Sequence, residues 1–311
     1  MRTLLVVNPF ATSTSGELRE EIVEMLDEKL SLTVKVTTRA SDATKFASTA
    51  QSEGFELVIS LGGDGTLNEI ANGVLQDPGH KSNPIIAAIP GGNANVFVRN
   101  IGWPKSPLAA CAQILDSVEQ NKVKTIGVGR ATTASLSRYF LFNCGIGLDA
   151  AVLARMQNWR ASGRRATDVA YTGLALHELL VRTNRKEPQI EVRDFNGTPL
   201  GKAHLALIIN LAPWTYLGEL ALPLTPEATL DTALDVFAAK ELTLSGISRL
   251  IRRAIRTETE NHDVSFITMS NQESASFVST EQMWVQVDGE VLERSQHLDV
   301  EYLPGALRIL V

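Results

Sequence analysis

The sequence has little of what disulfide-linked, zinc-binding or membrane-spanning proteins require. Only two of its 311 residues are cysteines, Cys111 and Cys144, and they lie far apart. We therefore expect a reducing compartment and no disulfide framework. The five histidines show neither HxxxH nor HExxH spacing, so a zinc site is not expected. No run approaches the ~18 apolar residues needed to cross a bilayer.

Charge and composition exclude further classes. The formal net charge is -6, so the whole-chain basic footprint of a nucleic-acid-binding protein is missing. Apolar residues make up 44% and charged residues 21%, which is typical of a globular protein large enough for two domains. The first apolar stretch is broken by Asn8 and Pro9, which predicts a strand rather than a signal peptide.

The first third of the chain alternates short apolar runs with helical patterns. This alternation is typical of an α/β domain with a mainly parallel sheet. Ser41 or Asp42 is the expected cap of the second helix. Strands are predicted at 4–7, 33–37, 57–61 and 84–89, and helices at 17–30, 41–53 and 66–75.

From about residue 126 onward the pattern predicts an all-β second domain, a sandwich of short strands. Turn pairs Asn196-Gly197 and Asp288-Gly289 separate some of these runs. Helical inserts are predicted at 150–182, broken near Gly163, and at 245–257. The strands are predicted at 126–128, 139–142, 189–192, 205–209, 234–237, 264–268, 284–287 and 298–302.

Three loops that follow early strands carry residues suited to binding phosphate. In an open α/β sheet, ligands bind at the carboxyl ends of the strands, so these loops are expected to converge. The strongest loop reads GGDGT at residues 62–66. Its glycines let the backbone approach a phosphate, and the helix after it contributes the positive end of its dipole. Asp64 is a candidate to hold Mg²⁺, and the alternative is a plain strand-to-helix turn.

The other two loops are weaker on their own. Gly91 and Gly92 again permit close backbone approach, and Asn93 and Asn95 offer neutral hydrogen-bonding groups. The loop after the first strand, at residues 8–16, is rich in hydroxyls. Each is compatible with an ordinary turn, and the placement after a strand is what favours a binding role.

Two later segments have competing interpretations. Asp288-Gly289 is typical of a hairpin turn. In the functional interpretation, Asp288 accepts the proton of an attacking hydroxyl while Glu290 helps to hold magnesium. The segment GIGLDA at 145–150 matches a dinucleotide fingerprint with Asp168 downstream, but the polar, basic residues 159–165 stand where its second strand is required.

These segments together resemble the diacylglycerol-kinase catalytic domain, whose superfamily includes sphingosine and ceramide kinases. The resemblance runs nearly end to end. It implies a phosphofructokinase-like nucleotide-binding α/β domain at 1–125, to which about 295–311 returns, and a β-sandwich lipid-substrate domain at 126–294. The matching segments are Asn8-Pro9, Thr38, GGDGTLNE at 62–69, PGGNAN at 90–95, GIGLDA at 145–150, DGE at 288–290 and LPGALRILV at 303–311.

The resemblance also implies roles for the matching residues. ATP and Mg²⁺ are the implied cofactors, with Asp288 as general base and Glu290 and Asp64 acting near the metal. The chain departs from the family at Val96, where an aspartate is usual, and at Asn93, where a threonine is usual. Asp231 is expected to bind a structural magnesium. The expected nucleotide-binding residues are Asn8, Pro9, Thr12, Thr38, Gly62, Gly63, Asp64, Gly65, Thr66, Asn68, Glu69, Gly91, Gly92, Asn93 and Asn95.

The sequence therefore predicts an ATP-dependent lipid kinase that transfers the γ-phosphate to a lipid hydroxyl, with diacylglycerol as acceptor and phosphatidic acid as product. The alternatives are an NAD kinase, which shares the GGDGT loop, and a non-catalytic relative that binds nucleotide or lipid. No nucleic-acid partner is expected. The expected location is the cytoplasm, with transient, peripheral contact at the inner face of the membrane.

Two groups of arginines are candidates for that membrane contact. The helix around 247–256 has an apolar face and a separate basic face, and cations close to anionic lipid contribute about 1 kcal/mol each. The second group surrounds Trp159. The alternative for both is a solvated helix face. The arginines are Arg249, Arg252, Arg253 and Arg256 in the first group and Arg155, Arg160, Arg164 and Arg165 in the second.

Overall fold

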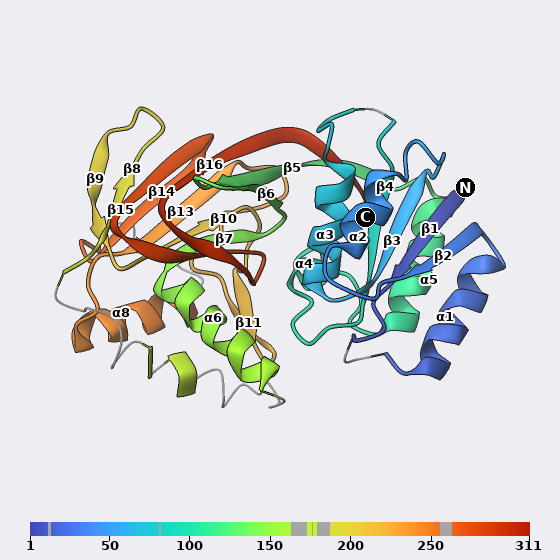
Figure 1. Cartoon of the computed structure of the whole chain (residues 1–311), viewed down its shortest axis with the longest axis horizontal. Helices are drawn as coiled ribbons and strands as arrows, with labels where there is room; N and C mark the ends of the chain where they lie inside the picture. Colours follow the sequence, from blue (N-terminus) through green and yellow to red (C-terminus); the bar gives the residue numbers. More distant parts are fainter. Residues whose placement is uncertain (12–13, 81, 163–172, 176, 179–186, 256–262) are drawn as a thin grey trace. The chain divides into compact units, whose positions relative to one another are not determined.

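The computed structural model of the chain is shown in Figure 1. It describes all residues except 12–13, 81, 163–172, 176, 179–186 and 256–262. The chain divides into two compact units. Unit 1 is formed by Met1–Val128 and Leu303–Val311, and unit 2 by Gly129–Tyr302.

Unit 1 is built on a parallel sheet in the order β2-β1-β3-β4. Its strands are β1 (Arg2–Val7), β2 (Ser31–Val36), β3 (Leu57–Gly62) and β4 (Ile85–Pro90). The end of β16 (Glu290–Leu310) joins β4 in parallel through Ile309 and Ile86. β3 and β4 are buried along their whole length, as expected for the central strands of a parallel sheet.

Helices of unit 1 pack in pairs. α1 (Gly16–Asp27) packs with α5 (Pro107–Glu119), and α2 (Asp42–Ser48) packs with α3 (Asp64–Val74). A short helix, α4 (Val96–Asn100), follows the second glycine loop. The helix predicted at 41–53 is shorter than expected, and α5 was not predicted.

Unit 2 is antiparallel, with strands in the order β14-β13-β10-β7-β15. β8 also pairs with β15, and β9 with β8. β5 (Val123–Thr132) pairs with β6 and begins in unit 1. The remaining elements are β6 (Ser137–Phe140), β7 (Asn143–Gly147), β8 (Ile190–Arg193), β9 (Pro199–Ala203), β10 (Leu205–Ile209), β11 (Thr215–Leu217), β12 (Leu220–Leu222), β13 (Leu234–Ala239), β14 (Phe266–Gln272), β15 (Ser274–Val287), α6 (Leu148–Ala161) and α8 (Leu244–Ile255).

Successive side chains along the central strands of unit 2 point to opposite faces of the sheet and pack into two cores. Ile208 and Val236 face a core that also receives Val192 from β8 and Phe277 from β15, so two layers of strands enclose it. On the opposite face, residues such as Phe237 belong to a second core. Two α8 residues, Leu250 and Ala254, pack against this second core.

The predicted fold class, an α/β domain followed by an all-β domain, is confirmed. Strand β7 was not predicted, because its sequence, NCGIG, contains two glycines and has weak strand propensity. The Asn196-Gly197 turn between β8 and β9 is as predicted. Among the helices that the structure describes, none is long and apolar enough to cross a membrane.

Candidate active site

The three loops that follow early strands converge in unit 1. The Gly91 N–H donates to the Gly62 carbonyl at 2.7 Å, because the two loops extend the pairing of β3 with β4. A Cβ on Gly92 would lie 2.8 Å from the Cα of Gly63, so a side chain there would force the loops apart. The glycines therefore allow two backbones to meet at one edge of the sheet.

The first loop joins this group through Asn8. Its Nδ2 donates to Thr66 Oγ1 at 3.0 Å, and its own N–H donates to the Leu61 carbonyl. Asn8 Oδ1 in turn accepts from the Phe10 N–H at 3.0 Å, which closes the loop on itself. The predicted convergence of loops at the carboxyl ends of the strands is thus observed for the residues that the structure describes; Thr12 lies outside them.

Asp64 ties the two glycine loops together. Its Oδ2 accepts from the Val96 N–H at 2.9 Å and its Oδ1 from the Phe97 N–H at 3.2 Å. These are the first N–H groups of α4, so the carboxylate satisfies that helix start and opposes its dipole. Asn95 completes the turn with its side chain bonded to both the N–H and the carbonyl of Gly92.

The start of α3 differs from that of α4. Gly63 is its N-cap residue, in an extended conformation, and a glycine has no side chain with which to cap the helix. Because the first N–H groups of a helix and its dipole attract anions, a helix start after a glycine loop is suited to bind a phosphate. This is the feature of unit 1 best suited to hold a nucleotide.

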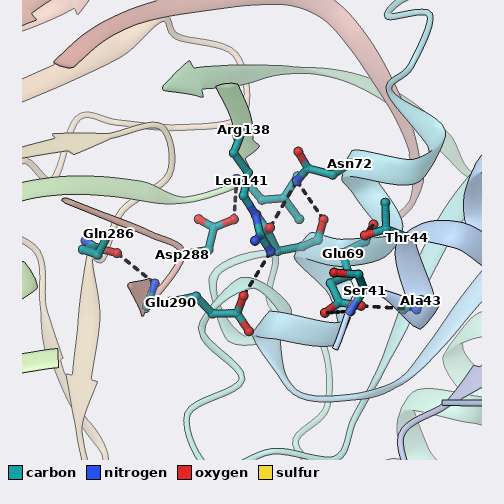
Figure 2. A network of polar contacts seen from close by, with 12 residues as sticks. Ser41, Ala43, Thr44, Glu69, Asn72, Arg138, Leu141, Gln286, Asp288 and Glu290 are labelled. Carbon is teal, nitrogen blue, oxygen red and sulfur yellow. Dashed lines mark hydrogen bonds and ion pairs between the residues drawn. The ribbon is translucent and has the colours of Figure 1, made fainter. Parts of the chain in front are cut away.

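Glu69 and Thr38 hold the neighbouring helix α2. Glu69 accepts from the Ser41 and Ala43 N–H groups at 2.9 and 3.2 Å, so it performs the capping expected of Ser41 or Asp42 (Figure 2). The N–H and hydroxyl of Thr38 both donate to Asp42 Oδ2 at 2.9 Å. The N–H of Thr38, followed by its hydroxyl, lowers the pKa of Asp42 to about 2.

The other predicted nucleotide-binding residues differ in accessibility. Asn93 is exposed and Pro9 and Gly65 are partly exposed, so they are accessible to a ligand. Asn68 is fully buried, and its Oδ1 accepts from Asn72 Nδ2 at 3.1 Å. Asn68 therefore lies inside the packed face of α3 in this structure.

In unit 2, Asp288 and Gly289 form the predicted hairpin turn between β15 and β16. Val287 pairs with Glu290, and both turn residues have positive φ, at 48° and 79°. This is the conformation of the tight turns that follow the twist of a hairpin. The interpretation of Asp288-Gly289 as a hairpin turn is confirmed, and it coexists with an unusual arrangement of the Asp288 side chain.

The Asp288 carboxylate is only 3% exposed and accepts from three successive backbone N–H groups. Leu141 N–H donates to Oδ2 at 2.8 Å, while Phe142 and Asn143 N–H groups donate to Oδ1 at 3.0 Å each. Leu141 and Phe142 form the bend between β6 and β7, and Asn143 begins β7, so the strand predicted at 139–142 ends at Phe140. The bend and the turn therefore fix each other.

Glu290 pairs with Arg138, whose Nη2 lies 3.0 Å from Oε2 (Figure 2). Both side chains are partly exposed. Arg138 was not predicted as a site residue, because a single arginine at a strand position carries no signal of its own. Its place opposite Glu290 depends on the pairing of strands that are far apart in the chain.

Three buried polar side chains lie next to the turn. Gln286 Nε2 donates to Asn143 Oδ1 at 2.8 Å and to Asp149 Oδ2 at 3.1 Å. Burial raises the pKa of Asp149 to about 6, against the opposing effect of the Gln286 hydrogen bond. Gly145 and Gly147 lie within β7 rather than in a phosphate-binding turn, which argues against the dinucleotide fingerprint. The Asp168 of that fingerprint lies outside the described residues.

Asp231, the predicted ligand of a structural magnesium, is exposed in the turn before β13, where its N–H donates to Thr229 Oγ1. Among the residues that the structure describes, no three His, Cys, Asp or Glu side chains gather to hold a metal. The role of Asp231 stays a prediction.

Comparison with known proteins shows which proteins this chain resembles. Residues 2–130 match the family model described as the diacylglycerol kinase catalytic domain. A diacylglycerol kinase of Staphylococcus carnosus (strain TM300) is 29% identical over 97% of this chain and 95% of its own length.

Two solved structures have a similar fold. One, a diacylglycerol kinase from Bacillus anthracis, has a TM-score of 0.71 and 23% identity, covering 99% of this chain and 96% of its own. The other, an NAD kinase from Archaeoglobus fulgidus in complex with ATP, has a TM-score of 0.54 and 13% identity, covering 100% and 94%. At these identities the likeness shows the fold alone. The match of residues 2–130 to the catalytic-domain model and the end-to-end similarity to the Staphylococcus enzyme support an ATP-dependent lipid kinase similar to the diacylglycerol kinases.

Proposed function

We propose that this kinase transfers the γ-phosphate of ATP to the free hydroxyl of diacylglycerol and so forms phosphatidic acid. The observation that carries the proposal is the start of α3, where the N-cap residue is a glycine and two glycine loops are in backbone contact. The acceptor is inferred from relatives, one of which is named a diacylglycerol kinase.

The nucleotide is proposed to bind with its phosphates on the N–H groups at the start of α3. Asn8 and Thr66 lie at this position and are hydrogen-bonded to each other. Gly92 and Asn93 follow from the second loop, which Asp64 holds in place through Val96 and Phe97. The usual family aspartate at 96 is missing, but the Val96 N–H still binds the Asp64 carboxylate.

Magnesium is proposed to accompany ATP. In kinases it is held by one or two carboxylates together with the phosphates of the substrate, so a protein cage of three or more ligands is not needed. Asp64 in unit 1 is a carboxylate proposed to hold it, and the role of Glu290 near the metal stays a prediction. When bound, the metal offsets the charge of the transferring phosphoryl group.

Asp288 is proposed to accept the proton of the attacking hydroxyl. Three N–H donors hold its side chain as a hydrogen-bond acceptor, which is the state that a general base requires. Arg138 beside Glu290 adds positive charge near the turn, where negative charge develops as phosphate is transferred.

The acyl chains are proposed to lie along α6. A cavity of about 470 Å³ in unit 2 is lined by this helix and by β15. Trp159 and Trp284 supply its aromatic surface, and the ion pair between Arg155 and Glu178 supplies its polar part. Asn158 and Ser162 add further polar groups, so the lining is mixed in polarity.

Contact with the membrane is proposed to involve α8, in a different way from the predicted basic face. Arg249 pairs with Glu241 and Asp263, and Arg253 lies over the rings of Phe237 and Phe266. The exposed part of the helix instead presents Ile251 and Ile255, which are 54% and 50% exposed.

Exposed isoleucines one turn apart, next to the exposed Arg252, are suited to shallow insertion at a lipid interface. In the second predicted group, Arg155 is paired with Glu178. Arg164 and Arg165 lie outside the described residues, as does Arg256 of the first group.

Sedimentation with vesicles of mixed anionic and neutral lipids tests this contact. The double change Ile251→Ser and Ile255→Ser should reduce binding about tenfold or more, since full burial of such a side chain contributes about 1.5–3 kcal/mol and each of these is already about half buried. Val36→Ser is a matched control, because Val36 is 49% exposed on β2 of unit 1. Unchanged vesicle binding of the double variant would contradict the proposed contact of α8 with the membrane.

An alternative is phosphorylation of a soluble dinucleotide, since an NAD kinase shares the fold. Phosphate transfer to mixed micelles of diacylglycerol, with NAD as a second acceptor, separates the two. Label in NAD and none in lipid would overturn the proposed acceptor.

A further inference from the structure

A short chain of hydrogen bonds within unit 2 connects the first turn of α6 to the turn that carries Asp288. Gln286 is at its centre and is only 1% exposed. Its Nε2 donates to Asp149 and Asn143, and its Oε1 accepts from the Gly289 N–H at 3.0 Å. A primary amide has one donor group and one acceptor atom, and both ends of this amide are used.

Gln286 therefore holds the turn from one side while Asn143 holds it from the other. The Asn143 N–H donates to Asp288 Oδ1, and the Asp288 N–H donates to the Asn143 carbonyl at 2.8 Å. The Asn143 side chain in turn accepts from Gln286 and donates to the Trp214 carbonyl at 2.8 Å. The Gln286 amide thus contacts both the turn and the residue that anchors the Asp288 carboxylate.

Asp149 fixes which way the Gln286 amide points. A carboxylate only accepts hydrogen bonds, so it requires the NH₂ end of the amide to face it and leaves the oxygen for Gly289. Without an acceptor at this position, a flipped amide would put its NH₂ group against the Gly289 N–H. Asp149 is itself almost fully buried in the first turn of α6.

The glycine of the GIGLDA segment makes room for this contact. A Cβ on Gly145 would lie 2.8 Å from Gln286 Nε2 and 3.0 Å from Asp149 Oδ2. Gly145 pairs directly with Gln286 across β7 and β15, so any side chain there would separate the two groups. The segment thus has a use in this chain that its resemblance to a nucleotide fingerprint does not suggest.

We infer that Gln286, oriented by Asp149, is a positioning residue that fixes the Asp288-Gly289 turn and thereby the direction of the Asp288 carboxylate during phosphate transfer. The inference rests on the proposed role of Asp288 as the general base. Gln286 does not touch the reacting atoms and acts only through the turn.

The test is steady-state phosphate transfer to diacylglycerol micelles with four variants. Gln286→Met keeps the length of the side chain and removes all of its hydrogen bonds. Gln286→Glu places two acid groups against each other, and the added change Asp149→Asn supplies an NH₂ donor to the new carboxylate. Ser295→Ala, which removes a buried hydroxyl from β16 away from the turn, is the structural control.

Gln286→Met should lower kcat about 10- to 100-fold, the usual effect of a misplaced catalytic group, while KM for ATP changes less than about twofold. The kcat of Gln286→Glu should be at least as low, and the kcat of the double variant should be about tenfold higher than that of Gln286→Glu. Ser295→Ala should keep the wild-type kcat. Thermal unfolding of each variant shows whether the protein is folded at the assay temperature.

Two results would overturn the inference. One is a folded Gln286→Met variant with the wild-type kcat. The other is a double variant no more active than Gln286→Glu alone, since the polarity of the pair would then be irrelevant. A wild-type protein that transfers no phosphate to any lipid is a different outcome, because it refutes the proposed function itself.

Discussion

Replacing Asp288 with asparagine separates its structural role from its proposed chemical role. The carboxylate accepts from three backbone N–H groups, two on Oδ1 and one on Oδ2. An asparagine of the same shape can keep its oxygen at the position of Oδ1 and so retain the bonds from Phe142 and Asn143. Its NH₂ group then faces the Leu141 N–H, and two donors meet where the carboxylate accepted one.

The stability cost follows from that count. The variant loses one charge-assisted hydrogen bond and leaves a buried N–H without an acceptor, which costs about 2–3 kcal/mol. For a unit of this size, such a loss lowers the midpoint of thermal unfolding by about 4–12 °C. The protein therefore stays folded at moderate temperature, and its activity remains measurable.

The chemical cost is separate and larger. Removing a general base typically reduces the rate by about 10²–10⁴-fold. Asp288→Asn should lower kcat for phosphate transfer by this factor, while the affinity for ATP, measured by isothermal titration, should change by less than about threefold.

Val300→Ala provides the matched control for stability. Val300 is buried in the core of unit 2, so its truncation destabilises the same unit without touching the turn. It should lower the unfolding midpoint and keep kcat. Asp288→Asn with a kcat near that of the wild type, or with a loss no greater than the unfolded fraction explains, would refute the proposed role of Asp288.

Two further predictions concern the glycine loops and the pH dependence of stability. Gly92→Ala puts a methyl group 2.8 Å from Gly63 and should weaken ATP binding about tenfold or more. The control is Gly102→Ala, at a glycine with open space around it but a positive φ of 76°, which should lower stability and leave the ATP affinity unchanged. Equal ATP affinities of the two variants would contradict the contact between the loops. The pKa of Asp149 is raised from 3.8 to about 6 by burial, so the stability it contributes is complete below pH 3.8 and falls by about 3 kcal/mol as pH rises through 6. In urea unfolding, Asp149→Asn should gain stability relative to the wild type over this window, and a constant difference from pH 4 to 7 would contradict the raised pKa.

The convergence of the loops in unit 1 was predictable because it depends on short-range signals. Each loop follows an apolar strand, and parallel strands deliver their ends to one edge of the sheet. What the carboxylates do there was not predictable. Asp64 binds N–H groups of Val96 and Phe97, and Glu69 binds N–H groups of Ser41 and Ala43. Such contacts depend on how separate loops meet, which no local pattern records.

Unit 2 shows a similar limit. The NCGIG sequence of β7 has weak strand propensity, yet its pairing with β10 and β15 makes it a central strand. Periodicity found both the apolar and the basic side of α8, but it did not indicate that Leu250 faces the core while Ile251 and Ile255 face outward. Which part of a helix is buried depends on the neighbours that the fold supplies.

The most direct test of the account is transfer of labelled γ-phosphate from ATP by the purified protein. The acceptors are mixed micelles of diacylglycerol, a sphingoid base or ceramide, with NAD as the soluble acceptor and magnesium varied. We predict magnesium-dependent label in diacylglycerol, none in NAD, and loss of the lipid label in Asp288→Asn. Label in NAD alone, or in lipid at an equal rate with Asp288→Asn, would contradict it.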